Sequence, residues 1–258
     1  LVLTGINMAQ YRHGSTDFTA LVKAILDLGL PARVRIASME PYGLGPDFAR
    51  LFANERLCPS LHLCLQSGSQ RILEAMTRSH GLGDYAALVA ELRAVRPDIA
   101  LSTDLIAGFP GGIEAEHQDS MEAARNLGFA SLHAFTYSRR RGTAADRMAD
   151  QVPEAVRTRR HDEIASLGQE LSKAWRTRLA GSRGRVIIEG VDVSEGRLAA
   201  WGRCGHGLEV RVDLGPATAA DRAERASNPG VWWNREIEVV LHDGPEGLYG
   251  TYGQSPIP

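Results

Sequence analysis

The sequence predicts an α/β fold with a parallel sheet, followed by a small all-β domain. Five short apolar runs, each ending in glycine or polar residues, recur at intervals of about thirty residues within the first 138 residues. Segments with helical spacing lie between these runs, and five further strand-like runs follow residue 185. Alternating strands and helices are typical of βα units, whereas a succession of short strands is typical of a small barrel or sandwich.

The five apolar runs predict parallel strands, because they are apolar on both faces, as buried parallel strands are. They are LVLTGIN (1–7), RVRIASMEP (33–41), LHLCLQSGS (61–69), LSTDLIAGFPGG (101–112) and LHAFTYS (132–138). In a parallel β/α barrel the active site forms where the strands end and the loops begin. We therefore expect the polar residues at these ends to meet in one cavity: Asn7, Glu40, Gln66, Asp104 and Ser138.

Helix signals separate the predicted strands. Capping residues at 15–17 precede an amphipathic segment that stops at Gly29, and two further helices are predicted over 84–95 and 114–127. Parallel strands need such crossover connections. A long, Arg-rich helical stretch follows at roughly 144–180.

The region from residue 185 predicts five strands and no helix of comparable strength. Its strand-like runs are VIIEGVDV, RLAAWGRC, LEVRVDL, REIEVVLHD and LYGTYG. Five short strands in about 70 residues suit a barrel of the oligonucleotide-binding type. We expect residues 217–230 to form a long loop, or a short helix followed by a loop. The predicted domains are 1–143, 144–184 and 185–258.

Composition limits the classes of function. No run approaches the roughly 18 to 20 apolar residues of a membrane helix, and three cysteines are too few for a disulfide framework, which predicts a cytoplasmic protein. The net charge of −2 is unevenly distributed. Residues 139–185 carry 12 Lys and Arg against 6 Asp and Glu, whereas residues 186–258 carry 6 against 11. The middle of the chain is therefore basic and its last part acidic.

The motifs resemble, in order and spacing, the methylthiotransferase branch of the radical S-adenosylmethionine enzymes. The matching segments are LTGIN, IASMEP, LHLCLQSGS with Met76 and Arg78 behind it, DLIAGFPGG and LHAFTYSRRRGTAA. Glu40-Pro41 and His133 favour the group that acts on threonylcarbamoyladenosine in tRNA, because the group acting on isopentenylated adenosine more often reads SPHP at the corresponding strand. The resemblance implies a partial β/α barrel of six strands, followed by a small β domain called TRAM.

The resemblance also implies roles for individual residues. Asn7 would bind the methionine part of S-adenosylmethionine, and Gln66 and Ser67 its ribose, since these side chains carry suitable donors and acceptors. The complete set of expected cofactor-binding residues is Gly5, Asn7, Ser38, Glu40, Gln66, Ser67, Asp104, Ile106, Gly108, Tyr137 and Ser138. Arg139, Arg140 and Arg141 would bind RNA phosphates, which guanidinium groups contact bidentately. No catalytic residue and no metal ligand is predicted.

Purely structural interpretations compete with these roles. Glycine and asparagine suit a strand-to-loop turn, Tyr137 suits a core position, and a run of arginines suits a solvated helix face. A carboxylate inside an apolar strand, such as Asp104, must be paired or face the cavity. We expect His62 and His133 to be core or cavity-lining residues rather than metal ligands. Asp104 with His62 would be the acid and base of an unrelated β/α-barrel lyase or hydrolase.

The chain departs from the family pattern at its cysteines. The family's first barrel strand precedes a C-x3-C-x2-C loop that holds a four-iron four-sulfur cluster, and a further N-terminal domain holds a second cluster. Cys58, Cys64 and Cys204 cannot replace those thiolates. We therefore expect an N-terminally truncated chain that covers strands two to six of the barrel, ligates no cluster and is inactive alone.

The expected complete enzyme adds a methylthio group to C2 of threonylcarbamoyl-modified adenosine beside the anticodon. Its expected partners are tRNA and S-adenosylmethionine, with two four-iron four-sulfur clusters in the full-length enzyme, and it would be a monomer without membrane contact. Two alternatives remain open: a catalytically inactive tRNA-binding module, and an enzyme acting on isopentenylated adenosine.

The chain departs from the family pattern at a second place, after GFPG. It has Gly112-Ile113 where the family reads Glu-Thr, which leaves Glu114 to stabilise the start of the next helix.

Overall fold

The computed structural model describes residues 1–194, 196–216, 235–245 and 247–252. The chain divides into two compact units, Leu1–Ser172 and Lys173–Pro258, which are considered separately below. This division falls inside the expected helical segment 144–184.

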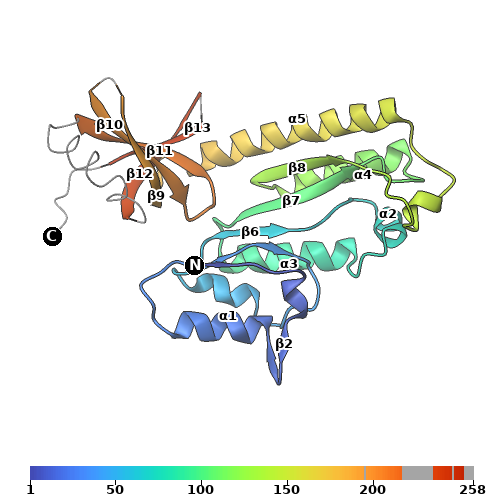
Figure 1. Cartoon of the computed structure of the whole chain (residues 1–258), viewed down its shortest axis with the longest axis horizontal. Helices are drawn as coiled ribbons and strands as arrows, with labels where there is room; N and C mark the ends of the chain where they lie inside the picture. The colour runs from blue at the N-terminus through green and yellow to red at the C-terminus, as the bar shows by residue number, and fades with distance from the viewer. Residues whose placement is uncertain (195, 217–234, 246, 253–258) are drawn as a thin grey trace. The chain divides into compact units, whose positions relative to one another are not determined.

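A parallel four-stranded sheet is the centre of the first unit (Figure 1). Its order is β5 (Ser38–Met39), β6 (Ser60–Leu63), β7 (Ala100–Ala107) and β8 (Ser131–Thr136). A separate parallel pair joins β1 (Val2–Leu3) to β4 (Arg35–Ile36), and Ala37 alone separates β4 from β5. All five expected strand segments therefore contribute parallel strands, as two sheets rather than one.

The first strand is shorter than the run 1–7 suggests. Asn7 adopts a left-handed conformation with φ 53° at the start of the short helix η1 (Met8–Gln10), so the chain leaves the sheet after Leu3. A small hairpin of β2 (Arg12–His13) and β3 (Thr16–Asp17), which the sequence did not suggest, follows.

Four α-helices connect the strands of the first unit. They are α1 (Phe18–Asp27), α2 (Gln70–Ala75), α3 (Leu82–Val95) and α4 (Glu114–Leu127), with the short helix η2 (Ala49–Ala53) before β6. The Asp17 side chain accepts a hydrogen bond from Ala20 N at 2.8 Å, as the capping pattern predicts. Gly128 ends α4 with φ 56°, a conformation that favours glycine.

The start of α4 corrects one expectation. Glu116, and not Glu114, accepts a hydrogen bond from Ile113 N, at 3.0 Å. Arg71 clamps the same carboxylate through Nε at 2.7 Å and Nη2 at 2.6 Å. Glu114 instead forms an ion pair with Arg159 at 2.8 Å. The missing acidic residue and threonine of the family motif are thus compensated one turn further along.

The Arg-rich stretch contains a shorter helix than expected. Residues 144–153 hold the short helix η3 (Ala145–Arg147) and turns, and α5 (Glu154–Leu179) begins after Pro153. Proline is favoured just before or within the first turn of a helix, since its missing N–H has no intrahelical partner there. Ile164 and Leu167 of α5 are buried in the core of the first unit. That core also holds the apolar side chains of the strands, such as Leu61, Leu63 and Leu101.

The second unit contains a closed five-stranded barrel. Its order is β10 (Arg197–Cys204), β11 (Glu209–Pro216), β13 (Gly247–Thr251), β12 (Glu236–Gly244) and β9 (Arg183–Ser194). Buried and exposed residues alternate along β10, as expected when one face of a strand fills a barrel. The loop expected at 217–230 lies outside the described residues. Among the described helices, none combines the length and hydropathy that a membrane crossing requires.

Candidate functional site

A cavity of about 660 Å³ opens where β6, β7 and β8 end. Ligand sites of small molecules and cofactors span roughly 300 to 1,000 Å³. Five of the eleven residues expected to bind the cofactor line it: Gln66, Asp104, Ile106, Tyr137 and Ser138. Arg140 lines it too, and so does the segment Ala75–Arg78. The cavity therefore combines residues that lie up to 79 positions apart in the sequence, from Gln66 to Ala145.

The remaining expected cofactor residues do not line this cavity. They are Gly5, Asn7, Ser38, Glu40, Ser67 and Gly108. Asn7 donates from Nδ2 to the Tyr42 hydroxyl at 3.0 Å, and Ser38 is an exposed residue of β5. Their roles toward a cofactor remain predictions.

Gln66 follows β6 and is hydrogen-bonded to β7 in a left-handed conformation, with φ 71°. Its N donates to Asp104 O at 2.9 Å, and its O accepts from Ile106 N at 2.9 Å. A left-handed backbone is costly for a residue other than glycine and is concentrated at functional sites. The two hydrogen bonds stabilise this conformation at the cavity wall.

Ser67 and Gly68 contact helix α4 instead of the cavity. Ser67 Oγ lies 3.3 Å from Ser120 Oγ, and the Gly68 N donates to the same Ser120 Oγ at 2.9 Å. A Cβ atom on Gly68 would lie 2.5 Å from Ser120 Cα, so only glycine fits. The second half of the LQSGS motif therefore fixes the contact between strand end and helix.

Gly108 is also required for a steric reason. Its φ is +74°, and a Cβ atom there would lie 2.3 Å from Arg157 Cγ of α5. Arg157 in turn donates from Nη1 to Tyr137 O at 2.7 Å. The glycine thus allows α5 to approach the end of β8 beside the cavity.

Arg78 is a cavity residue to which the sequence assigned no role. It lies behind the helix α2, and its Nη1 forms an ion pair with Glu40 Oε1 at 2.9 Å. Glu40 thus acts on the cavity through Arg78, which brings a positive charge to the wall. Arg78 belongs to the matching segment behind LHLCLQSGS, so the sequence pointed to this residue. Its role was missed because its partner Glu40 lies 38 residues away.

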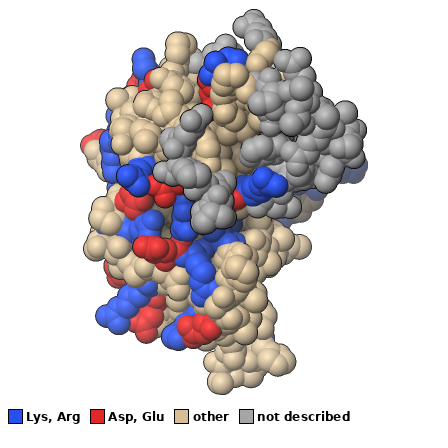
Figure 2. All heavy atoms as spheres, turned by 90° about the vertical axis from the view of Figure 1, so that its left-hand side faces the viewer, with Lys and Arg blue, Asp and Glu red and all other residues tan. Residues whose placement is uncertain are grey.

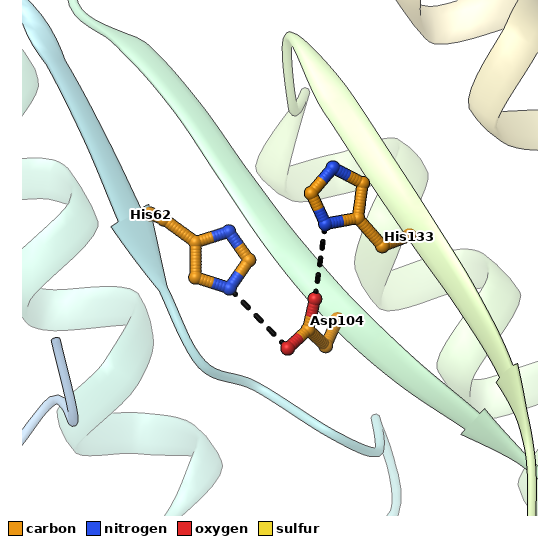
Figure 3. A group of neighbouring side chains, drawn as sticks. All are labelled: His62, Asp104 and His133. Carbon is orange, nitrogen blue, oxygen red and sulfur yellow. Dashed lines mark hydrogen bonds and ion pairs between the residues drawn. The ribbon is translucent and has the colours of Figure 1, made fainter. Parts of the chain in front are cut away.

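Asp104 joins two histidines from the neighbouring strands (Figure 3). His62 Nε2 lies 3.3 Å from Asp104 Oδ2, and His133 Nδ1 lies 3.2 Å from Oδ1. The two imidazoles stack with ring centroids 5.4 Å apart and planes 17° apart. The carboxylate is therefore paired and also lines the cavity, so both options that the sequence left open are realised.

The electrostatics of this cluster favour charged forms. Burial alone would lower the pKa of His62, but hydrogen bonds and negative charge from Asp104 and Cys64 outweigh burial and raise the pKa of His62 to about 9. Burial would likewise raise the pKa of Asp104, yet the bonds and charges of His62 and His133 hold it below its ordinary value.

The three expected RNA-binding arginines have different surroundings. Arg139 donates from Nε to Asp146 Oδ1 at 2.6 Å, and this ion pair lowers the pKa of Asp146. Arg140 lines the cavity, and Arg141 is exposed. Phosphate binding by all three remains a prediction.

The buried hydroxyl of Tyr137 indicates whether the cavity suits a polar ligand. Tyr137 Oη is buried and has no hydrogen-bond partner among the described residues. The ring of Tyr137 packs edge-on against Phe109, with centroids 5.5 Å apart. Buried polar groups without a partner are uncommon, so this hydroxyl fits a ligand that supplies the missing partner.

Several curated relatives are similar to about three quarters or more of the chain. A threonylcarbamoyladenosine tRNA methylthiotransferase of Treponema pallidum is 36% identical over 198 residues, which is 77% of this chain and 40% of the relative. A protein of the same name from Thermotoga maritima is 34% identical over 191 residues, 73% of this chain and 44% of the relative. About three quarters of the chain is therefore similar to these methylthiotransferases.

Other members of the methylthiotransferase family match equally well. The tRNA-2-methylthio-N(6)-dimethylallyladenosine synthase of Nitratidesulfovibrio vulgaris strain Hildenborough is 34% identical over 221 residues, which is 83% of this chain and 49% of the relative. The chain thus spans less than half the length of these relatives. No family model matches the chain.

The fold of this chain resembles that of a radical S-adenosylmethionine enzyme. Coproporphyrinogen III oxidase of Escherichia coli aligns with a TM-score of 0.50 at 15% identity, covering 84% of this chain and 60% of the other. The α/β fold class is confirmed by this likeness.

The family implies S-adenosylmethionine and iron–sulfur clusters as cofactors. The cavity, with its buried Tyr137 hydroxyl, fits the first. The three cysteines do not fit the second, since Cys58, Cys64 and Cys204 are all buried and Cys204 belongs to the other unit, whereas the family's cluster loop brings three thiolates together within eight residues.

Proposed function

We propose that the chain forms the S-adenosylmethionine pocket of a tRNA methylthiotransferase. The observation that carries this proposal is the 660 Å³ cavity at the ends of three parallel strands. Three family motifs contribute to its wall: the first through Gln66 and Arg78, the second through Asp104 and the third through Tyr137. When bound, S-adenosylmethionine supplies the 5′-deoxyadenosyl radical on reductive cleavage in this enzyme class.

The residues of the chain would bind and orient the cofactor. Tyr137 Oη would hydrogen-bond the cofactor, Gln66 would present its amide to the ribose, and Ile106 would pack against the adenine. Arg78, held by Glu40, offers a positive charge for the methionine carboxylate. Arg140 at the cavity wall would meet an RNA phosphate.

The proposed substrate is threonylcarbamoyl-modified adenosine beside the tRNA anticodon. Relatives of both substrate types match with similar identity, 36% and 34%, so overall similarity does not choose between them. Glu40-Pro41 and His133 support the threonylcarbamoyl type. Glu40 positions Arg78 and His133 holds Asp104, so both marker residues act on cavity-lining side chains. The isopentenylated type is the alternative.

Deletion of the gene followed by mass spectrometry of tRNA nucleosides tests this function. We expect the 2-methylthio form of threonylcarbamoyladenosine to disappear, while the isopentenyl form persists. Re-expression of the entire deleted gene should restore it, and the same gene carrying Gln66→Ala should not. Loss of the isopentenyl form instead would favour the alternative substrate, and no change in either nucleoside would contradict the enzyme assignment.

We further propose that the sheet strands β1, β4, β5, β6, β7 and β8 correspond to strands two to six of the radical-enzyme barrel. Residues 185–258 would be the TRAM-like domain. The closed five-stranded barrel in the second unit supports this assignment. The proposal covers a protein that acts as a monomer and binds tRNA, and the chain without clusters is expected to leave S-adenosylmethionine intact.

A row of side chains across the barrel favours a second candidate function, an RNA-binding module. Trp201 pairs in register with Arg211, Arg211 with Tyr249, and Tyr249 with His242. Trp201 and Tyr249 are 40% and 45% exposed, and the Tyr249 and His242 rings stack 4.9 Å apart. Exposed aromatic rings beside arginine are the usual platforms for stacking unpaired bases.

The charges around this row are mixed rather than uniformly basic. Figure 2 shows Lys and Arg interspersed with Asp and Glu on the face of the molecule that it draws. On the barrel, Arg197 is paired with Asp213 and Arg183 with Glu238. We therefore expect base stacking, more than phosphate contacts, to drive binding to this row.

Titration of a single-stranded RNA oligonucleotide, followed by fluorescence anisotropy, tests the row. The Trp201→Ala and Tyr249→Ala variants should each weaken binding roughly tenfold, since stacking is worth about 1 to 3 kcal/mol per base. Val240→Ala, an exposed apolar residue of β12, is the matched control and should bind like the wild type. Equal affinities of all variants would exclude the row as an RNA platform.

A further inference from the structure

Three side chains from adjacent parallel strands form a compact donor set. His62 of β6, Asp104 of β7 and His133 of β8 each offer a ligand atom, and these atoms all lie within 4.8 Å of one another. The side chains of His62 and Asp104 are only 16% and 21% exposed. Two imidazoles with one carboxylate are a common donor set for divalent transition metals.

The separations between the donor atoms suit coordination. Ligand atoms at about 2.0 to 2.1 Å from a tetrahedral ion lie about 3.3 Å from each other. The nitrogen–oxygen distances are 3.3 Å for His62 with Asp104 and 3.2 Å for His133 with Asp104. Figure 3 shows both ring nitrogens directed toward the same carboxylate. An ion bound here would take the place of these two N–H···O contacts, one to each oxygen of the carboxylate.

The other ring nitrogen of His62 has a fixed partner. His62 Nδ1 lies 3.0 Å from Ser102 Oγ, and Ser102 pairs with His62 in the sheet register. Histidine ligands usually donate their second ring N–H to such a group, which fixes the tautomer and the ring orientation. Ser102 thus directs Nε2 of His62 toward Asp104.

A second group of histidine and carboxylate side chains differs from the first in having a cation beside it. Glu114, His117 and Glu163 also bring ligand atoms together. However, Arg159 Nη2 lies 2.8 Å from Glu114 and Arg159 Nη1 lies 2.6 Å from Glu163, so a guanidinium already neutralises both carboxylates. No comparable cation contacts Asp104 among the contacts of the described residues, where its partners are the two histidines.

We propose that His62, Asp104 and His133 bind one divalent transition-metal ion of the zinc type. Asp104 lines the 660 Å³ cavity, so a remaining coordination position faces a space that a small ligand can enter. The site would tie three neighbouring strands together at the cavity floor. This proposal does not rest on the proposed enzymatic function, and it assigns the two histidines a role that the sequence did not favour.

Titration of the chelator-treated chain with Co²⁺, a spectroscopic substitute for Zn²⁺, tests the site. We expect one equivalent to bind with visible ligand-field absorption, and Zn²⁺ to displace it. His62→Gln and Asp104→Asn should abolish stoichiometric binding. Ser102→Ala should weaken it by about tenfold, as loss of a partner behind a ligand does. His117→Gln, in the contrasting group, is the matched control and should bind as the wild type does.

Circular dichroism of each variant shows whether it has folded, and only folded variants count in the comparison. His133→Gln gives a second ligand deletion at a half-exposed position, where folding is least at risk. Absence of stoichiometric binding, or binding retained in both Asp104→Asn and His62→Gln, would overturn the proposal. A thiolate-to-metal charge-transfer band, or loss of binding in His117→Gln, would place the ion elsewhere and overturn it equally.

Discussion

His62 and Asp104 form an ion pair between adjacent strands, with 3.3 Å between Nε2 and Oδ2. The pair connects β6 to β7 at the floor of the cavity, where Asp104 also meets His133. Its charge state therefore controls both the stability of the sheet and the electrostatics of the cavity.

The first prediction concerns the pH dependence of stability in the presence of a chelator. The pKa of His62 is raised to about 9 from an unfolded value of 6.5, so its contribution is complete below pH 6.5 and is lost as the pH rises through 9. We expect the free energy of unfolding to fall by about 3 kcal/mol over that range. Urea unfolding at several pH values measures it. Asp104→Asn should remove most of this dependence, and a His62 pKa near 6.5 by NMR would contradict the account.

The second prediction separates steric contact from backbone strain in the GFPGG motif. Gly108→Ala meets Arg157 at 2.3 Å in addition to a positive φ of +74°. Gly111→Ala has a similar φ of +78° but no contact closer than 3.8 Å. We expect Gly111→Ala to cost about 1 kcal/mol and Gly108→Ala about 1 to 3 kcal/mol more. Thermal or urea unfolding of both variants measures these two losses of stability. Equal losses would show that the Arg157 side chain moves away and that the steric contact costs nothing.

The third prediction concerns the start of α4. Glu116 accepts from Ile113 N and from Arg71, and its side chain is 10% exposed, whereas the Glu114 side chain is 50% exposed. Glu116→Gln should cost about 1 to 3 kcal/mol, because it breaks a largely buried charged hydrogen-bond network. Glu114→Gln, the matched control, should cost less than Glu116→Gln, because the Glu114 side chain is half-exposed, although it pairs with the buried Arg160 as well as with Arg159. The reverse order would show that Glu114 stabilises the helix start after all.

Local patterns predicted much of the fold. Apolar runs with flanking caps located the parallel strands, and helices such as 114–127 agree with the structure because periodicity and the glycine after the helix act locally. The strand over 1–7 was predicted, but not that β1 is only two residues long, and the β2–β3 hairpin was not predicted, since a two-residue strand carries no periodicity. The start of α5 moved to the residue after Pro153, where the proline limits the helix.

The site was harder to predict because its contacts join distant parts of the sequence. The motif around Gln66 was found, yet Ser67 beside it contacts Ser120, 53 residues later. Gly108 serves the approach of Arg157, which no local pattern records. The cross-strand row from Trp201 to His242 depends on sheet register, which composition does not determine. Sequence motifs thus located the cavity, while tertiary contacts decided which side chains line it.

Binding of S-adenosylmethionine to the chain, measured by isothermal titration calorimetry, tests the central claim most directly. We expect saturable one-to-one binding, weakened about tenfold in Tyr137→Phe, because the buried hydroxyl would lose the hydrogen bond that only the ligand provides. Tyr249→Phe, which removes an exposed hydroxyl in the other unit, is the matched control and should leave the affinity unchanged. Absence of saturable binding, or equal affinity of Tyr137→Phe and the wild type, would contradict the assignment of this cavity as the cofactor site.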